Sequence, residues 1–315
     1  MLNRLIVIVG PTASGKSALA MQLALRFGCE IVSGDSMCIY RGMDIGTAKP
    51  SLSDRQQVPH HLIDIRNPGE DFSVVDFQRL AGEAITDINQ RGKIPILVGG
   101  TGLYVQALLE GYKFNPTPRT ELRSELENCA EAEAETVSLH QQLTAVDPAA
   151  AERIHPHDRK RILRALEVVT VDQQSISSEK SADAPEMLFD CIVFGLSLDR
   201  QELYQRINAR VDMMLNAGLV DEVRTLLGNG LTVNSTALQA IGYKELVSYL
   251  HGAGSLQEAA DQIKQSSRRY AKRQLTWFRR MSYIRWLSQT SEETSGGGGA
   301  FLPSALQVAE KFSIK

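Results

Sequence analysis

The sequence predicts an α/β fold in which helices flank a parallel sheet and a helical domain is inserted. Three observations support this prediction. Short apolar runs at residues 5–9, 93–98 and 191–196 are typical of buried parallel strands. Segments with helical periodicity lie between these runs, as in alternating strand–helix folds. The segment between the first strand and the first helix matches a phosphate-binding loop, G-x-x-x-x-G-K-[ST].

The phosphate-binding loop lies in the context that its function requires. The apolar run 5–9 enters it, and a helical pattern over 17–27 leaves it and stops at Gly28. Backbone amides and the positive end of the helix dipole then face a bound anion, and Lys16 adds a full charge. The Ser17 hydroxyl can bind Mg²⁺. The residues expected at the phosphate are Gly10, Pro11, Thr12, Ala13, Ser14, Gly15, Lys16 and Ser17.

Composition excludes several classes of protein. The chain has 315 residues and a formal net charge of −3, so no general basicity indicates a nucleic-acid partner. Its four cysteines form no C-x-x-C pair, which argues against a disulfide framework or a zinc site. No apolar run is long enough to span a bilayer. We therefore expect a protein of the reducing cytoplasm.

Asp35 is the first candidate for chemistry beyond phosphate binding. It follows the predicted strand at residues 30–33, and ligands of open α/β sheets bind beyond the carboxyl ends of the strands. A turn aspartate is the alternative. Beside a phosphate loop, a catalytic or metal-linked carboxylate is the better interpretation. A long loop at residues 40–50 and a second strand-to-glycine-loop junction at 99–104 are expected at the same edge.

The chain changes character near residue 114. Proline residues mark a boundary there, and residues 121–169 are rich in helix formers, first acidic and then basic. We predict a core of residues 1–113 and 189–290, a helical insertion at 114–188, and a flexible tail without an expected role at 291–315.

Two sets of basic residues admit alternative interpretations. Arg206 and Arg210 lie four apart on one helix face, which is either solvated surface or a clamp for a diphosphate. Residues 264–286, predicted as one helical region, hold eight basic and no acidic side chains with aromatics between them. They form either a solvated face above an aromatic core or a surface for a polyanion larger than one nucleotide.

Several stretches together resemble the tRNA dimethylallyltransferases, also called tRNA isopentenyltransferases. The matching stretches are 10–17, 35–36, 40–50, 99–104, 241–244 and 272–279, in order across residues 4–290. The resemblance implies a P-loop NTPase-like core with a helical insertion that grips the anticodon stem-loop. It implies transfer of a dimethylallyl group from dimethylallyl diphosphate to the exocyclic N6 amine of an adenosine. That adenosine lies 3′ of the anticodon in tRNAs that read codons beginning with U.

The resemblance also implies residue roles. Asp35 is the implied general base, Thr101 contacts the flipped adenosine, and Thr12 to Ser17 hold the diphosphate. We expect Lys16, Mg²⁺ near Ser17, and Arg206 and Arg210 to stabilise the leaving diphosphate. The implied tRNA contacts are Asp35, Ser36, Met37, Cys38, Thr101, Arg123, Arg159, Lys160, Arg161, Ile162, Leu163, Gln239, Ala240, Ile241, Gly242, Tyr243, Lys244, Lys272, Arg273, Gln274, Leu275, Thr276, Trp277, Phe278 and Arg279.

Two departures and three alternatives accompany this resemblance. Gln239 stands where some members carry arginine, and residues 171–186 match nothing in the family. The alternatives are a prenyltransferase acting on free adenine nucleotides, a P-loop small-molecule kinase, and a non-catalytic RNA-binding module. The basic C-terminal segment, the lack of a lid-type arginine pattern, and Asp35 with the Thr101 loop argue against them in turn. We expect a monomer that binds tRNA and dimethylallyl diphosphate and no membrane.

Overall fold

The computed structural model of the protein describes residues 2–114, 133–172, 186–288 and 301–313. The chain divides into two compact units, Met1–Gly111 with Met187–Lys315, and Tyr112–Glu186. The smaller unit covers nearly the same residues as the helical insertion at 114–188 that the sequence predicts. Within the described residues no helix combines the length and the apolar character needed to cross a membrane.

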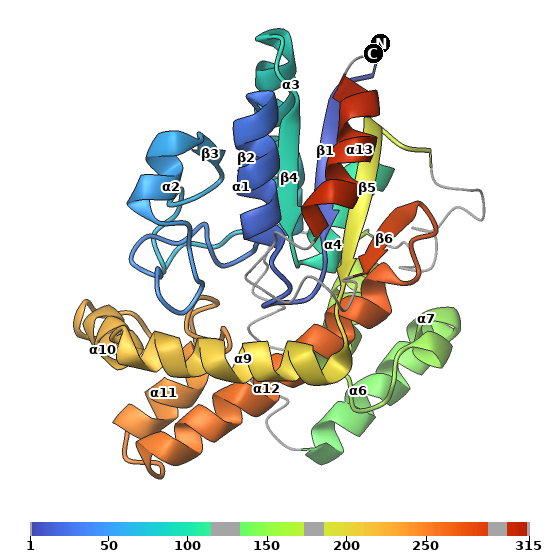
Figure 1. Ribbon diagram of the computed structural model, residues 1–315. Helices are drawn as coiled ribbons and strands as arrows, with labels where there is room; N and C mark the ends of the chain where they lie inside the picture. Colours follow the sequence, from blue (N-terminus) through green and yellow to red (C-terminus); the bar gives the residue numbers. More distant parts are fainter. Residues whose placement is uncertain (1, 115–132, 173–185, 289–300, 314–315) are drawn as a thin grey trace. The chain divides into compact units, whose positions relative to one another are not determined.

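The larger unit is built on a parallel sheet (Figure 1). Within its described residues, six strands pair in the order β3-β2-β4-β1-β5-β6. Their bounds are β1 Arg4–Val9, β2 Glu30–Ser33, β3 His60–His61, β4 Pro95–Gly99, β5 Asp190–Ser197 and β6 Ile284–Ser288. Every pairing is parallel, which confirms the predicted α/β class.

Helices cover both faces of the sheet, and alternate residues of each strand point to opposite faces. The strands therefore contribute to two buried cores. Leu5, Val7 and Val9 of β1 join a core with helices α3 (Val74–Gln90) and α4 (Gly102–Glu110). Ile6 and Ile8 point the other way, into a core with α1 (Lys16–Phe27) and α13 (Leu302–Ser313). The continuous apolar run of the sequence therefore serves two cores.

Local capping signals mark the ends of several helices. Helix α1 ends at Gly28, which adopts the left-handed conformation with φ 65°. Helix α3 begins with a capping box in which Ser73 and Asp76 bond reciprocally. The same arrangement begins the short helix α2 (Leu52–Gln57) at Ser51 and Asp54.

A group of helices lies beyond the carboxyl ends of the strands, below the sheet in Figure 1. It consists of α9 (Arg200–Asn216), α10 (Leu219–Gly228), α11 (Tyr243–Leu250) and α12 (Leu256–Phe278). These helices share an apolar cluster with Ile39, Tyr40 and Met43 of the loop that follows β2. Ligand-binding loops of open α/β sheets occupy this edge, so the helices form the far wall of a site.

The smaller unit is helical in its described part. Its helices are α6 (Glu133–Val146), α7 (Pro148–Arg153) and α8 (Arg159–Asp172). They bury an apolar cluster that includes Leu143, Ala150 and Ile162. Asp147 begins α7 by accepting a hydrogen bond from the Ala150 amide at 3.0 Å.

Two predictions about the end of the chain are wrong. Residues 264–286 do not form one helix, because α12 ends at Phe278 and β6 begins at Ile284 beside β5. Residues 301–313 are not a flexible tail, because they form α13, which buries Phe301, Ala305 and Ala309 against the sheet. In both segments, packing against β5 decides the structure.

Candidate active site

The phosphate loop leaves β1 and folds back tightly before α1. Gly10 (φ 151°) and Gly15 (φ 92°) adopt conformations that favour glycine, and Ala13 is left-handed at φ 64°. A Cβ on Gly10 would lie 3.1 Å from the carbonyl oxygen of Leu196 in β5, so glycine is needed there for the close approach. Ala13 packs against Leu203, Ile207 and Ala271 of helices α9 and α12. These contacts hold the loop in its tight turn.

Three ionisable side chains meet beside the loop. Lys16 lies on α1, Asp35 follows β2, and Arg210 projects from α9. Burial, and then the nearby Arg210, lower the pKa of Lys16 to about 7, whereas Asp35 acts in the opposite direction. Burial also lowers the pKa of Arg210, against the effect of Asp35. Two half-buried cations near one carboxylate leave positive charge in excess, which favours an anionic ligand.

Neither cation is neutralised within the described part of the chain. The Lys16 ammonium donates to the Pro11 carbonyl oxygen at 2.6 Å, and Arg210 makes no ion pair there. The other predicted clamp residue, Arg206, pairs with Glu202 at 2.6 Å and lies outside the cavities described below. The structure therefore separates the two arginines, and only Arg210 is placed to contact a diphosphate.

Asp35 is both a turn residue and an open carboxylate. Its Oδ1 accepts hydrogen bonds from the amides of Met37 at 2.8 Å and Cys38 at 3.3 Å. Its Oδ2 accepts none from the residues that the structure describes. One oxygen thus has the role of a turn residue, and the other has no partner among the described residues.

Two cavities meet at Asp35. The first, of about 570 Å³, runs along the phosphate loop and is lined by Lys16, Ser17, Cys38 and the backbone of Gly99 and Gly100. The second, of about 360 Å³, opens between the loop after β2 and the helices α9, α11 and α12. The residues that line both are Thr12, Asp35, Thr47, Arg210 and Tyr270. A molecule in each cavity would therefore meet its neighbour beside Asp35.

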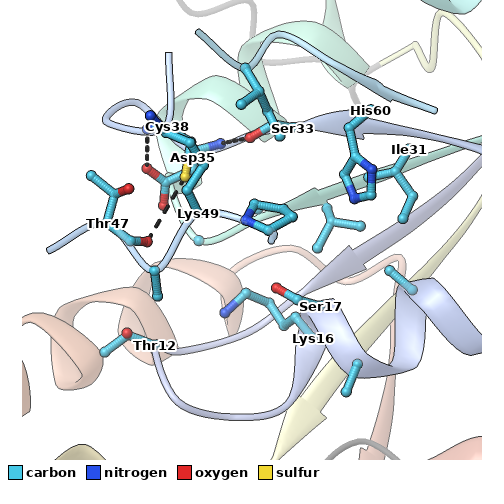
Figure 2. A pocket seen from close by; sticks show the side chains of 18 of the residues that line it. Thr12, Lys16, Ser17, Ile31, Ser33, Asp35, Cys38, Thr47, Lys49 and His60 are labelled. Atoms are coloured by element: carbon cyan, nitrogen blue, oxygen red, sulfur yellow. Dashed lines mark hydrogen bonds between the residues drawn. The ribbon is translucent and has the colours of Figure 1, made fainter. Parts of the chain in front are cut away.

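Figure 2 shows the first cavity from close by. Lys16 and Ser17 project from α1 on one side, and Asp35, Cys38 and Thr47 lie on the opposite wall. Ile31 and His60 line the other end of the cavity. The polar groups thus gather at the end where the second cavity begins.

Two charged side chains hold the loop at residues 40–50: Lys49 joins its ends, and Glu222 binds its middle. Lys49, whose side chain is 1% exposed, binds Asp64 at 2.7 Å and donates to the Tyr40 carbonyl at 2.8 Å. Glu222 on α10 accepts from the amides of Asp44 and Ile45, both at 2.8 Å, and from Gly46 at 3.1 Å. These contacts fix Thr47 where the cavities join.

Glu222 also orients Tyr243, which sequence reasoning assigned to tRNA. The phenol of Tyr243 donates to Glu222 at 2.6 Å, and the tyrosine is fully buried. Burial, followed by the charge of Glu222, raises the pKa of this phenol far above its usual range. A Cβ on Gly46 would lie 2.4 Å from the Tyr243 ring, so glycine permits this packing. The sequence carried no signal for Glu222, because three of its partners are backbone amides 176 or more residues away and the fourth is the phenol of Tyr243 on another helix.

Thr101 begins α4 and lies near Asp35 without lining either cavity. Its hydroxyl oxygen accepts a hydrogen bond from the Ser36 amide at 3.3 Å. Tyr270 of α12 lies beside it, and burial raises the pKa of that phenol to about 12. Tyr270 was noted in the sequence only as an aromatic between basic residues. Its position at both cavities makes it a wall of the site.

The other residues predicted to contact tRNA lie at the second cavity, on α8, on α12 or, for one of them, outside the described residues. Ser36, Met37 and all of Gln239 to Lys244 line the second cavity. Arg159 to Leu163 begin α8 in the smaller unit, where Lys160 and Arg161 are exposed but Ile162 and Leu163 are buried. Arg123 lies outside the described residues.

Helix α12 divides the last predicted group by face. Lys272, Arg273, Thr276 and Arg279 are exposed. Phe278 is buried in the sheet core, and Leu275 and Trp277 pack against apolar clusters. Gln274 is 5% exposed and has both amide atoms bonded within the protein. The side chains of Gln274 and Phe278 therefore expose little surface, and Gln274 lines the first cavity.

Comparison with known proteins identifies the family of the chain. The family model described as IPP transferase matches residues 38–281, and the model described as isopentenyl transferase matches residues 3–69. A tRNA dimethylallyltransferase of Geobacillus thermodenitrificans is 50% identical over 293 residues, which cover 93% of each chain. One from Geobacter metallireducens is 50% identical over 289 residues, covering 90% of this chain and 92% of the relative.

Solved structures give the same result. A tRNA isopentenylpyrophosphate transferase of Bacillus halodurans has a TM-score of 0.72 and 42% identity, with 99% of this chain and 97% of that chain covered. A eukaryotic dimethylallyltransferase described as acting on tRNA has a TM-score of 0.79 and 29% identity, with 98% and 79% covered. The resemblance inferred from motifs is confirmed, and the chain belongs to the family of tRNA dimethylallyltransferases, or IPP transferases.

Proposed function

We propose that this protein transfers the dimethylallyl group of dimethylallyl diphosphate to the N6 amine of an adenosine in tRNA and releases diphosphate. The target is the adenosine 3′ of the anticodon in tRNAs that read codons beginning with U. The observation that carries the proposal is the junction of two cavities at Asp35, one walled by a phosphate loop. Two substrates that enter separately would react at that junction.

Asp35 is the general base in this proposal. The exocyclic amine is a weak nucleophile, and its nitrogen becomes acidic as the carbon–nitrogen bond forms. Oδ1 is held by two backbone amides, so Oδ2 has a fixed direction from which to take the proton. The bond between the allylic carbon and the diphosphate oxygen breaks, and its electron pair leaves with the diphosphate.

The phosphate loop and two cations stabilise the leaving diphosphate. Burial and the nearby Arg210 lower the pKa of Lys16 to about 7, and its ammonium donates to an uncharged partner, the Pro11 carbonyl oxygen. A bound diphosphate would raise that pKa again, because an opposite charge favours the ammonium. Arg210 lines both cavities and supplies a planar donor for the same oxygens.

Mg²⁺ fits this site as a partner of the substrate. No group of three histidine, cysteine, aspartate or glutamate side chains in the described residues could hold a metal ion alone. Mg²⁺ commonly binds through one or two protein ligands with substrate phosphates and water, and the exposed Ser17 lines the cavity beside Lys16. Bound there, Mg²⁺ would supply charge that stabilises the diphosphate as it leaves.

The second cavity is the proposed site of the adenine. Its walls include Gln239 to Lys244, the amide-held turn at Asp35, and Tyr270. Extruding a base from a stacked loop costs a few kcal/mol, which contacts in such a pocket offset. We propose that the exposed cations of α12 and of α8 bind the tRNA backbone, and that the enzyme acts as a monomer because one chain forms both cavities.

A transfer assay with several acceptors tests this function. Dimethylallyl diphosphate labelled in the allyl group is mixed with the protein, Mg²⁺ and either tRNA, AMP or ATP. We expect label in tRNA alone, at the adenosine after the anticodon. Label in AMP or ATP instead would show a prenyltransferase of free nucleotides, and no transfer to any acceptor would contradict the proposal.

Lys16→Ala tests the assignment of the first cavity to the diphosphate. Because Lys16 lines the first cavity and not the second, transfer should be lost while tRNA affinity is kept. Equal losses of transfer and of tRNA binding would contradict this assignment of the two cavities.

A further inference from the structure

Gln274 connects the two glycine loops of the site. It projects from α12, is 5% exposed, and lies between the phosphate loop and the loop that precedes Thr101. Its Oε1 accepts a hydrogen bond from the Thr12 amide at 2.9 Å. Its Nε2 donates to the Gly100 carbonyl oxygen, also at 2.9 Å. One amide side chain therefore satisfies a donor of one loop and an acceptor of the other.

The surrounding atoms leave this side chain little freedom. A Cβ on Gly100 would lie 2.2 Å from Gln274 Nε2, and a Cβ on Gly102 would lie 2.4 Å from Trp277 Cδ1. Residues 274 and 277 both face the second loop, since residues three apart share a helix face. Glycines at 100 and 102 are thus required for α12 to approach so closely. This close packing fixes the position of Thr101 relative to the phosphate loop.

The hydrogen bond at Thr12 also changes the phosphate site. The amide of Thr12 points at Gln274 and is not available to a phosphate oxygen. Anion binding is then left to the later amides of the loop and to Lys16. The sequence prediction that Thr12 holds the diphosphate applies to its side chain, which lines both cavities, and not to its amide.

We propose that Gln274 is a positioning residue for group transfer. It sets the distance between the loop that holds the diphosphate and the loop that carries Thr101 and orients the turn at Asp35. The allylic carbon and the amine must approach within bonding reach, and a misplacement of about 1 Å can cost a hundredfold in rate. This inference rests on the proposed function. Gln274 lines the first cavity, but its Oε1 and Nε2 are already bonded to Thr12 and Gly100, so we assign it to alignment rather than to contact with tRNA or diphosphate.

Two variants remove the connection in different ways. Gln274→Leu removes both hydrogen bonds with little change of volume. Gln274→Glu keeps an acceptor for Thr12 but, when ionised, places an oxygen against the Gly100 carbonyl. When the introduced carboxyl is protonated, it can donate to Gly100 and restore both bonds. The control is Gln265→Glu, the same change at an exposed position of the same helix.

The rate constant of a single turnover is the decisive measurement, with enzyme in excess over labelled dimethylallyl diphosphate and saturating tRNA. We expect both variants to lose about tenfold to a hundredfold, with tRNA affinity unchanged and the control unaffected. As the pH falls, the rate constant of Gln274→Glu should approach that of wild type. The rate constant of Gln274→Leu should stay lower than that of wild type by the same factor.

The outcomes separate alignment from simple instability. A residue that only stabilises the fold would lower the melting temperature and the fraction of active enzyme, seen in the reaction amplitude, and leave the rate constant intact. That result would overturn the inference, and so would equal pH profiles for the two variants. If wild type itself fails to modify tRNA, the proposed function is wrong. Normal wild-type transfer with normal variant rates contradicts the role of Gln274 alone.

Discussion

Asp35 divides its two oxygens between structure and chemistry. Oδ1 is bound by the amides of Met37 and Cys38, which shapes the turn after β2. Oδ2 accepts no hydrogen bond from the described residues, and Asp35 lines both cavities. A substitution that preserves the turn and removes the basic oxygen therefore isolates the chemical role.

Asp35→Asn should slow transfer and leave the fold intact. The amide oxygen can still accept from Met37 and Cys38, but the side chain can no longer take a proton. Loss of a general base costs about a hundredfold to ten-thousandfold in rate. Single-turnover kinetics with both substrates saturating provide the measurement. A near-normal rate would exclude Asp35 as the base, and recovery at high Mg²⁺ concentration would assign it to the metal.

Glu30 stabilises the start of β2 through buried charge. Glu30 is 3% exposed. Its carboxylate binds Arg91, Lys93 at 2.9 Å and His61 at 2.9 Å. The hydrogen bond from Arg91 is the largest cause that lowers the pKa of Glu30 below its usual range. A lowered folded-state pKa means that this stability is present above the unfolded-state pKa and is lost as the pH falls.

We expect Glu30→Gln to lower the free energy of unfolding at pH 7 by about 1 to 3 kcal/mol. The difference from wild type should shrink below about pH 4.3, where the glutamate of the unfolded chain becomes protonated. Denaturant unfolding at several pH values measures it. A difference that stays constant down to pH 3 would show that charge is not the cause.

At the scale of elements, α12 serves three surroundings at once. Tyr270 and Gln274 face the site, Phe278 enters the sheet core, and Lys264 and Arg268 bind Asp212 at 2.6 Å and Asn208 at 2.6 Å on α9. Only part of its basic set is therefore free for a partner. Lys272 and Arg279 are exposed and form no ion pair within the part of the chain described by the structure.

Removing Lys272 and Arg279 together should weaken tRNA binding and flatten its dependence on salt. Each phosphate contact contributes about 0.7 to 0.9 to the slope of log affinity against log salt, so the double alanine variant should lose about 1.4 to 1.8. Titrations at several salt concentrations measure the slope. Arg26→Ala with Arg79→Ala is the control, because these arginines are exposed on α1 and α3. Equal slopes in both double variants would show that α12 presents only a solvated face.

At the scale of the whole chain, residues near its beginning and its end lie together on one face of the sheet. The guanidinium of Arg4 lies 4.6 Å from the centre of the Phe312 ring, and α13 packs on the same face of the sheet as α1, over β5 (Figure 1). Phe301 is 1% exposed in that core. The last helix thus completes the apolar core that it shares with α1, the helix that begins at Lys16.

Phe301→Ala should destabilise the larger unit by about 3 to 5 kcal/mol, the usual cost of such a change in a core. Chemical denaturation followed by circular dichroism measures the loss. Ser304→Ala is the control, since Ser304 is exposed on the same helix. If the two variants unfold at the same denaturant concentration, α13 is not part of the stable core.

The sequence alone determined the features that depend on neighbouring residues. The strand, glycine loop and helix at 4–27 follow from a motif and two periodicities, and they appear as predicted. The place of Asp35 followed from the rule that loops after parallel strands share one edge. The family followed from several motifs in order, and comparison confirmed it.

Only the tertiary structure decided which face of each element meets the site. Arg206 and Arg210 are equivalent by spacing, but the packing of α9 sends only Arg210 into the cavities. Glu222 and Gln274 bind backbone groups of loops far away in the chain, and no local pattern marks such partners. Residues 284–288 form a strand because β5 offers an unpaired edge, which outweighs local helical preference. Periodicity specifies what an element is, and long-range packing specifies what it touches.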